Sequence, residues 1–175
     1  MKSLVLPVLL LATAAVAQTS ALRGLDTSGP IDVDAARIEI QDTDNQAIFS
    51  GDVVIRQGKL TLKSDTVKVS YTNTGGAGPE MQRLDARGNV VLLSPSERAT
   101  GNTGIYDVNN KLITLIGNVT LDRGGSQLKG QRLVINLASG QTSFDGKGGA
   151  SPTAQGTQPG RVTGRFLVPE KGKKP

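Results

Sequence analysis

The 175-residue chain contains no cysteine, no histidine and no tryptophan, and aromatic residues make up only 3% of it. Without cysteine there is no disulfide scaffold, no thiol nucleophile and no thiolate metal site. Without histidine, the commonest general base, the Ser-His-Asp triad and ordinary zinc sites are excluded. So few aromatic side chains offer almost no stacking platform for bases. We therefore expect no nucleic-acid partner.

Carboxylate chemistry is the main catalytic option that remains, and two aspartate pairs lie close together in the sequence: Asp32 with Asp34, and Asp42 with Asp44. Paired carboxylates can serve glycoside hydrolysis. However, the second pair lies in a polar turn, where aspartate is common for conformational reasons. No glycine-rich phosphate loop follows a strand and opens a helix. We predict that the protein is not an enzyme and has no catalytic residue, metal site or cofactor.

Residues 1–17 have the pattern of a cleaved signal peptide. A short basic start precedes an apolar run from Leu4 to Val16, and Ala15-Val16-Ala17 supplies the small residues of a cleavage site. The alternative is a retained membrane anchor, but the run is short for a membrane span and Pro7 interrupts it. We therefore expect an exported protein.

The remaining chain divides by composition into three parts. Residues 18–30 form a leader with little pattern, which we expect to be flexible, and residues 31–145 form one patterned domain. Residues 146–175 are rich in Gly and Pro and end in a basic tail, with room for one further strand near 161–168. The net charge of +5 suits anionic surfaces, although simple solubility explains it equally well.

A glycine and a small polar residue, followed by aliphatic residues, recur three times in the patterned domain. The copies are Gly51-Asp52-Val53, Gly88-Asn89-Val90 and Gly117-Asn118-Val119. Thirteen positions after each glycine comes a small residue with a polar partner: Ser64-Asp65, Gly101-Asn102 and Gly130-Gln131. A repeat of roughly 30 to 37 residues is typical of architectures in which units bury their apolar faces by stacking.

Within the repeats, apolar residues alternate with polar ones, and no helical period is sustained. Aligning the copies gives two apolar columns, one of Val53, Ile55, Val90, Leu92, Val119 and Leu121, the other of Ile38, Val69, Tyr106 and Ile135 with their neighbours two positions away. Period-2 patterning with frequent turns predicts an all-β fold. A bend of small residues between the columns predicts strands that fold back, so that two sheets face each other.

The pattern alone leaves the interior open to two interpretations. One is a closed aliphatic core, and the other is a groove that buries acyl chains. In the second case, basic residues at the rim, such as Arg37, Lys63, Lys68 and Lys129, could meet lipid phosphates. The first strand, from Ile31 to Ile40, presents Ala36, Ile38 and Ile40 on one face and is a candidate unpaired edge.

Several of these features together resemble the OstA-like family of periplasmic lipopolysaccharide-transport proteins, the LptA type, over about residues 30–140. They are the exported start, the segments Ile31-Asp32-Val33-Asp34-Ala35 and Phe49-Ser50-Gly51-Asp52-Val53-Val54-Ile55, and the Gly-Asn-Val repeats. The resemblance implies a twisted, V-shaped β-jelly roll with a hydrophobic groove for the acyl chains of lipid A. The residues implied to line the groove are Ile38, Val53, Ile55, Val67, Val69, Val90, Leu92, Tyr106, Val119, Leu121, Leu133 and Ile135.

The resemblance also implies partners at both edges of the sheet. An LptC-like inner-membrane protein would bind the N-terminal edge at Ala36, Ile38 and Ile40, and an LptD-like outer-membrane protein would bind the C-terminal edge. Copies would associate head to tail and bridge the periplasm. The alternative function is that of an exported structural or adhesive β-repeat protein with a closed core.

Overall fold

The computed structural model describes residue 27 and residues 29–73, 78–146 and 160–167. The expected signal peptide, almost all of the expected leader and most of the C-terminal segment lie outside the described residues. Among the described residues, no helix has the length and apolar character needed to cross a membrane.

The described residues form ten strands and one short 3-10 helix, η1 (Asp42–Asp44). The strands are β1 (Asp32–Asp34), β2 (Arg37–Gln41), β3 (Gln46–Gln57), β4 (Leu60–Asn73), β5 (Pro79–Leu93), β6 (Glu97–Asp107), β7 (Leu112–Arg123), β8 (Ser126–Asn136), β9 (Thr142–Asp145) and β10 (Thr163–Arg165). A tight turn at Gly58-Lys59 joins β3 to β4, because Gln57 pairs with Leu60 on either side of it.

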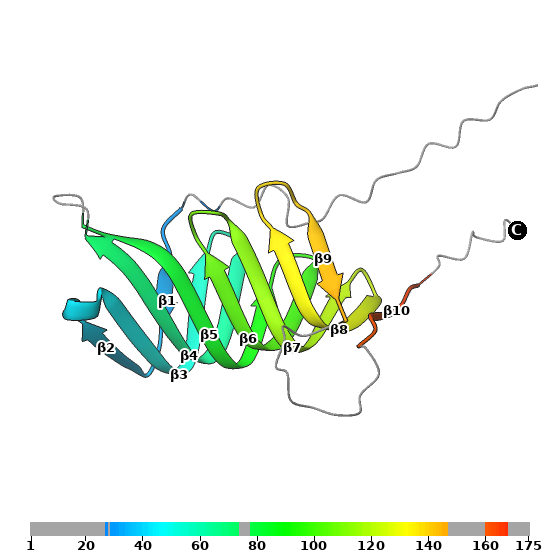
Figure 1. Cartoon of the computed structure of the whole chain (residues 1–175), viewed down its shortest axis with the longest axis horizontal. Helices are drawn as coiled ribbons and strands as arrows, with labels where there is room; N and C mark the ends of the chain where they lie inside the picture. Colours follow the sequence, from blue (N-terminus) through cyan, green and yellow to red (C-terminus); the bar gives the residue numbers. More distant parts are fainter. Residues whose placement is uncertain (1–26, 28, 74–77, 147–159, 168–175) are drawn as a thin grey trace, which may run out of the picture.

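Six long strands, β3 to β8, pair antiparallel with their neighbours in chain order and form the body of one sheet (Figure 1). Short strands complete both ends. β1 and β2 pair with the two halves of β3, while β10 and β9 pair with the two halves of β8. The sheet is therefore not closed into a barrel, and it ends in short strands on both sides.

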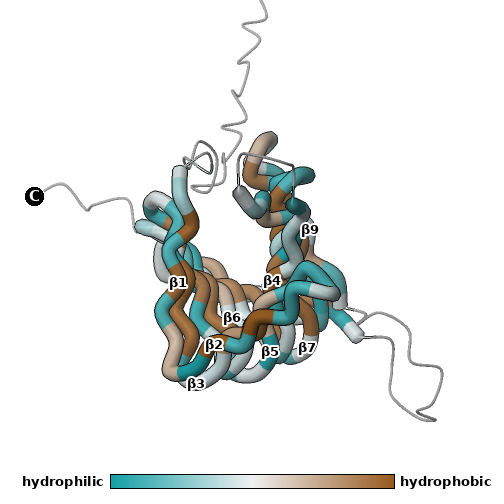
Figure 2. Tube along the Cα trace, turned by 90° about the vertical axis from the view of Figure 1, so that its left-hand side faces the viewer, coloured by the Kyte–Doolittle hydropathy of each residue, from teal (hydrophilic) through white to brown (hydrophobic). Residues whose placement is uncertain are grey.

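Each long strand passes through a bend near its middle, so the sheet folds into two arms (Figure 2). We call them the β1 arm and the β2 arm. The β1 arm contains β1, β10 and the halves of the long strands within residues 53–64, 90–101 and 119–130. The β2 arm contains β2, β9 and the other halves. The sequence predicted two facing sheets, and the structure shows one sheet folded on itself.

The repeated glycine motif makes the bend. At each copy two residues, such as Gly88 and Asn89, stand opposite a single residue of the next strand, Asn102 in this case. This is a β-bulge, which bends a strand. Both residues have positive φ, 77° for Gly88 and 47° for Asn89, a conformation that glycine and asparagine tolerate best. The residue opposite the bulge, namely Asp65, Asn102 or Gln131, is thus the polar partner that follows the small residue thirteen positions after each glycine.

Gly88 is also required by close contact. A Cβ built there would lie 2.1 Å from Oδ2 of Asp65. Asp65 occupies that space because its carboxylate accepts hydrogen bonds from the Asn89 amide at 2.9 and 3.1 Å. The bend therefore carries a hydrogen-bonded pair of Asp65 and Asn89, and the absence of a side chain at Gly88 makes room for it.

The first predicted strand differs from the observed one. The sequence predicted a single strand from Ile31 to Ile40, but the chain turns between β1 and β2 and crosses from one arm to the other. Ala36 lies at this turn, where its N–H donates to the Gly51 carbonyl at 3.0 Å and its side chain faces the Gly51 Cα. The turn is thus the N-terminal counterpart of the bulges in the long strands.

Candidate functional site

The interior between the two arms is the main apolar feature of the molecule. Eleven of the twelve sequence-predicted groove residues are buried there, with exposed fractions from 0% to 6%: Val53, Ile55, Val67, Val69, Val90, Leu92, Tyr106, Val119, Leu121, Leu133 and Ile135. They alternate with outward-facing residues and form one cluster with contributions from both arms. Each such side chain stabilises the fold by about 1.5–3 kcal/mol through burial.

Ile38 is the exception among the predicted groove residues. It stands opposite Phe49, which is buried, so it faces the same side of the sheet as the interior. However, β2 is the last strand of its arm, and Ile38 is 55% exposed. Ile40, two residues on, is 65% exposed. The apolar inner face therefore continues to the N-terminal end of the sheet without cover among the described residues.

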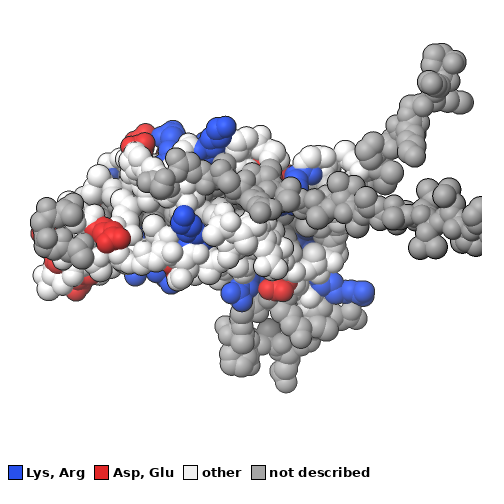
Figure 3. Space-filling model, turned by 90° about the horizontal axis from the view of Figure 1, so that it is seen from above, with Lys and Arg blue, Asp and Glu red and all other residues white. Residues whose placement is uncertain are grey.

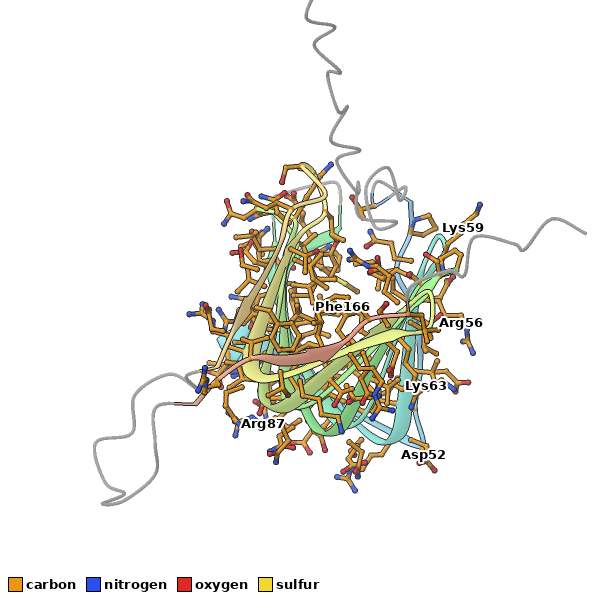
Figure 4. All side chains as sticks on the ribbon, turned by 90° about the vertical axis from the view of Figure 1, so that its right-hand side faces the viewer. Asp52, Arg56, Lys59, Lys63, Arg87 and Phe166 are labelled. Atoms are coloured by element: carbon orange, nitrogen blue, oxygen red, sulfur yellow. The ribbon has the colours of Figure 1, made fainter. Side chains whose placement is uncertain are left out.

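The C-terminal end has a matching feature. Gly164 of β10 stands opposite Leu128, a partly buried residue that packs against the core cluster. Phe166, two residues later, projects into the space between the arms at this end and is 66% exposed (Figure 4). Residues 161–168 do not alternate cleanly, so Phe166 was not predicted as an interior or edge residue. Both ends of the interior therefore carry exposed apolar side chains.

A pocket runs between the arms in the middle of this interior. Its lining is apolar apart from Gln57 and the Tyr106 hydroxyl, and it consists of Ile31, Ile55, Gln57, Leu60, Leu62, Leu84, Leu92, Gly104, Ile105, Tyr106, Ile113 and Leu115. Gly104 occupies an inward position at which the neighbouring repeat has Val67. A Cβ at Gly104 would lie 3.0 Å from Val90 Cγ1 and 3.2 Å from Leu115 Cδ2, so these side chains already use most of the space.

A polar connection crosses the interior at this pocket. The Tyr106 hydroxyl, from the β2 arm, donates to Gln57 Oε1 of the β1 arm at 3.0 Å. Gln57 Nε2 in turn donates to the backbone carbonyls of Thr27 at 2.8 Å and Gly29 at 3.1 Å. Gln57 and Tyr106 are only 5% and 6% exposed, and burial raises the pKa of Tyr106.

This connection was not predicted, because Gln57 was not among the residues expected in the interior. A signal existed, since Gln57 follows Ile55 by two positions and so faces inward with it.

An ion pair lies at the tip of the β1 arm. Glu97 and Arg123 are directly opposed on β6 and β7, and Arg123 Nε lies 2.6 Å from Glu97 Oε1. The Glu97 side chain is 3% exposed, whereas that of Arg123 is 35% exposed. A buried carboxylate without its partner would cost several kcal/mol, so Arg123 keeps Glu97 compatible with an inward position.

Other charged side chains are scattered in small groups over the surface that Figure 3 shows. Lys63 points away from the interior in Figure 4, and Lys68 and Lys129 are exposed residues at outward positions close to the bend. The prediction that these lysines line the rim was wrong, because the bend places them at the closed side of the V. Within the described part of the chain, no group of three Asp or Glu residues is arranged to hold a metal ion.

Comparison with known families decides what kind of protein has this interior. Residues 32–141 match the family described as LptA/(LptD N-terminal domain) LPS transport protein. The chain belongs to this family. The match confirms the resemblance that the sequence indicated, and it spans both arms from β1 to the residue before β9.

Two relatives and one solved structure are similar to this chain over most of its length. An uncharacterized protein of Rhizobium meliloti (strain 1021) is 34% identical over 149 residues, which is 80% of each chain. The lipopolysaccharide export system protein LptA of Haemophilus influenzae is 26% identical and covers 81% of this chain and 85% of its own length. The crystal structure of LptH, the LptA homologous periplasmic component of the lipopolysaccharide transport device of Pseudomonas aeruginosa, aligns with a TM-score of 0.69 and 20% identity. It covers 82% of this chain and 99% of that one. The all-β fold prediction is therefore confirmed.

Proposed function

We propose that the protein is a periplasmic lipopolysaccharide-transport protein that carries lipid A acyl chains between its two arms. The observation that supports this most directly is the apolar interior of an unclosed sheet in a chain of this family. Burial of acyl chains requires no directional contact and stabilises the complex by about 25 cal/mol per Å² of apolar area. Export by the predicted signal peptide, residues 1–17, is part of this proposal.

The proposal includes bridging through the two ends of the sheet. Ile38 and Ile40 at one end and Phe166 at the other are large, apolar, exposed residues on the inner side. Stacking one sheet end on another would cover them and join the interiors into one track. A heterologous contact of this kind can repeat head to tail. An LptC-like protein at the β2 end and an LptD-like protein at the β10 end would complete the path between the membranes.

A structural β-repeat protein with a closed core is the second candidate. It is favoured by one observation, namely that the inner side chains already fill most of the interior, as their exposed fractions of 0–9% show. In the carrier, the arms must therefore separate before acyl chains enter. The two candidates thus differ in whether the interior ever admits lipid.

Photo-crosslinking distinguishes these candidates. A photoreactive residue at Val69, which is 2% exposed on the inner face, should capture lipopolysaccharide in cells. The same residue at Lys68, its exposed neighbour on the outer face, should not. Capture at neither position, in a variant whose thermal unfolding shows that it is folded, would refute the carrier function. Equal capture at both positions would show surface binding in place of an interior track.

A further inference from the structure

The buried contact between Gln57 and Tyr106 is the only side-chain hydrogen bond recorded between the arms among the described residues. Polar groups in an apolar interior are costly unless each donor and acceptor has a partner. Here the Tyr106 hydroxyl satisfies Gln57 Oε1, and two backbone carbonyls satisfy Gln57 Nε2. The arrangement is therefore complete only while the N-terminal segment is in place.

That segment forms part of the pocket wall and accepts both hydrogen bonds of the Gln57 amide, as a ligand could. Its Thr27 and Gly29 carbonyls accept from the Gln57 amide, and the Ile31 side chain forms part of the apolar lining two residues further on. Carbonyl oxygens next to an aliphatic group are also the pattern of an acyl chain at its amide or ester linkage. In the free protein, the Thr27 and Gly29 carbonyls thus bind to Gln57 where the carbonyl of such a linkage would bind.

We propose that Gln57, held by Tyr106, is a recognition site for the amide or ester carbonyl of an acylated amphiphile. The segment around Thr27, Gly29 and Ile31 is the internal occupant that this ligand displaces. The inference rests on the proposed function and deepens it, since it names the carbonyl group that the site binds. If the segment leaves, the Gln57 amide is buried without an acceptor, and only a ligand that carries a carbonyl restores the hydrogen bond.

The test compares two amphiphiles with the same saturated chain. N-tetradecanoyl glucosamine has an amide carbonyl before its saturated alkyl chain, whereas tridecyl glucoside has an ether oxygen before the same alkyl chain. Binding of each to the purified protein is measured below its micelle concentration by displacement of an apolar fluorescent dye. The amide is expected to bind about tenfold more tightly, because one buried donor is left unpaired by the ether.

The Gln57→Met variant should bring the two affinities to within about twofold, since methionine keeps the length of the side chain and removes the amide. Gln141→Met, at an exposed position on the loop before β9, is the matched control and should keep the tenfold ratio. If Gln57→Met does not fold, Tyr106→Phe replaces it and should reduce the ratio, because Gln57 loses the hydroxyl that fixes its orientation. A single cysteine introduced by Ile31→Cys, in a chain that has no other cysteine, should react faster with a thiol reagent when the amide ligand binds, because the half-buried position at the pocket wall becomes exposed.

The outcomes separate this inference from the carrier function. Equal affinities for the two amphiphiles in the unmodified protein, or an unchanged ratio in Gln57→Met, would overturn carbonyl recognition and leave an apolar carrier. An unchanged thiol reactivity of Ile31→Cys with bound amide would overturn the displacement. Failure to bind either amphiphile, together with failure to capture lipopolysaccharide at Val69, would overturn both proposals.

Discussion

Replacing Gly88 by alanine tests whether the bend depends on the glycine in the way the structure indicates. The substitution has two effects. It places a side chain at φ of 77°, and it brings a Cβ within 2.1 Å of Asp65 Oδ2 and 2.8 Å of Asp65 Cγ. The Asp65 carboxylate must then rotate away and lose its hydrogen bonds to the Asn89 amide.

The two effects have separate magnitudes. Strain at positive φ costs about 1–2 kcal/mol, and the lower entropy of the unfolded chain offsets about 0.5 kcal/mol of it. Loss of an exposed hydrogen bond to a carboxylate adds about 1 kcal/mol. We expect Gly88→Ala to lower the free energy of unfolding by about 2 kcal/mol, which is a Tm decrease of about 4–8 °C for a domain of this size.

Gly124→Ala is the matched control. Gly124 also has positive φ, 54°, but nothing lies within 4 Å of a Cβ built there, so only the strain applies. Its expected cost is about 1 kcal/mol. Urea unfolding followed by circular dichroism measures both variants. In an Asp65→Gly background, the cost of Gly88→Ala should fall to that of the control. If Gly88→Ala costs no more than Gly124→Ala in the unmodified background, the close contact with Asp65 has no role at the bend.

Two further predictions concern the sheet end and the buried tyrosine. Ile38→Asp should weaken self-association in light scattering while changing the free energy of unfolding by less than about 1 kcal/mol, because an exposed side chain contributes little burial. Arg37→Ser, on the outer face of β2, is its control. Equal association of the two variants would contradict a contact at this end. Because burial raises the pKa of Tyr106, the folded protein should keep this proton to higher pH than the unfolded chain. The associated stability is present below the ordinary tyrosine pKa of about 10 and is lost as the pH rises through the raised value. Ultraviolet absorbance should show a late ionisation step that is absent in Tyr106→Phe, and a step that persists in this variant would assign it to Tyr71.

Much of the fold was readable from local sequence patterns. Alternation placed Val53, Ile55, Val119 and Leu121 on an inner face, and the structure buries all four. The recurring glycine and small polar residue were identified as a repeat, and the structure places them at the bend, where positive φ and bulge geometry act within a few residues. Such features leave a signal in any single repeat, and three repeats made that signal strong.

Other predictions failed because they depended on how far a residue lies from the bend along its strand. Three lysines that were predicted at the rim of the groove lie within a few residues of the bend, and therefore near the closed side of the V: Lys63, Lys68 and Lys129. The single strand from Ile31 to Ile40 divides at Ala36 because it must follow the bend of β3.

The all-β repeat and its inner and outer faces were predictable from the amino-acid sequence, because they follow from side-chain period and backbone conformation. The buried hydrogen bond at which the arms meet was not predictable, because Gln57 and Tyr106 are 49 residues apart in the chain. The same is true of the Thr27 and Gly29 carbonyls that complete this contact. Contacts of this kind depend on the angle between the arms and on the path of the chain before β1, and neither leaves a local pattern in the sequence.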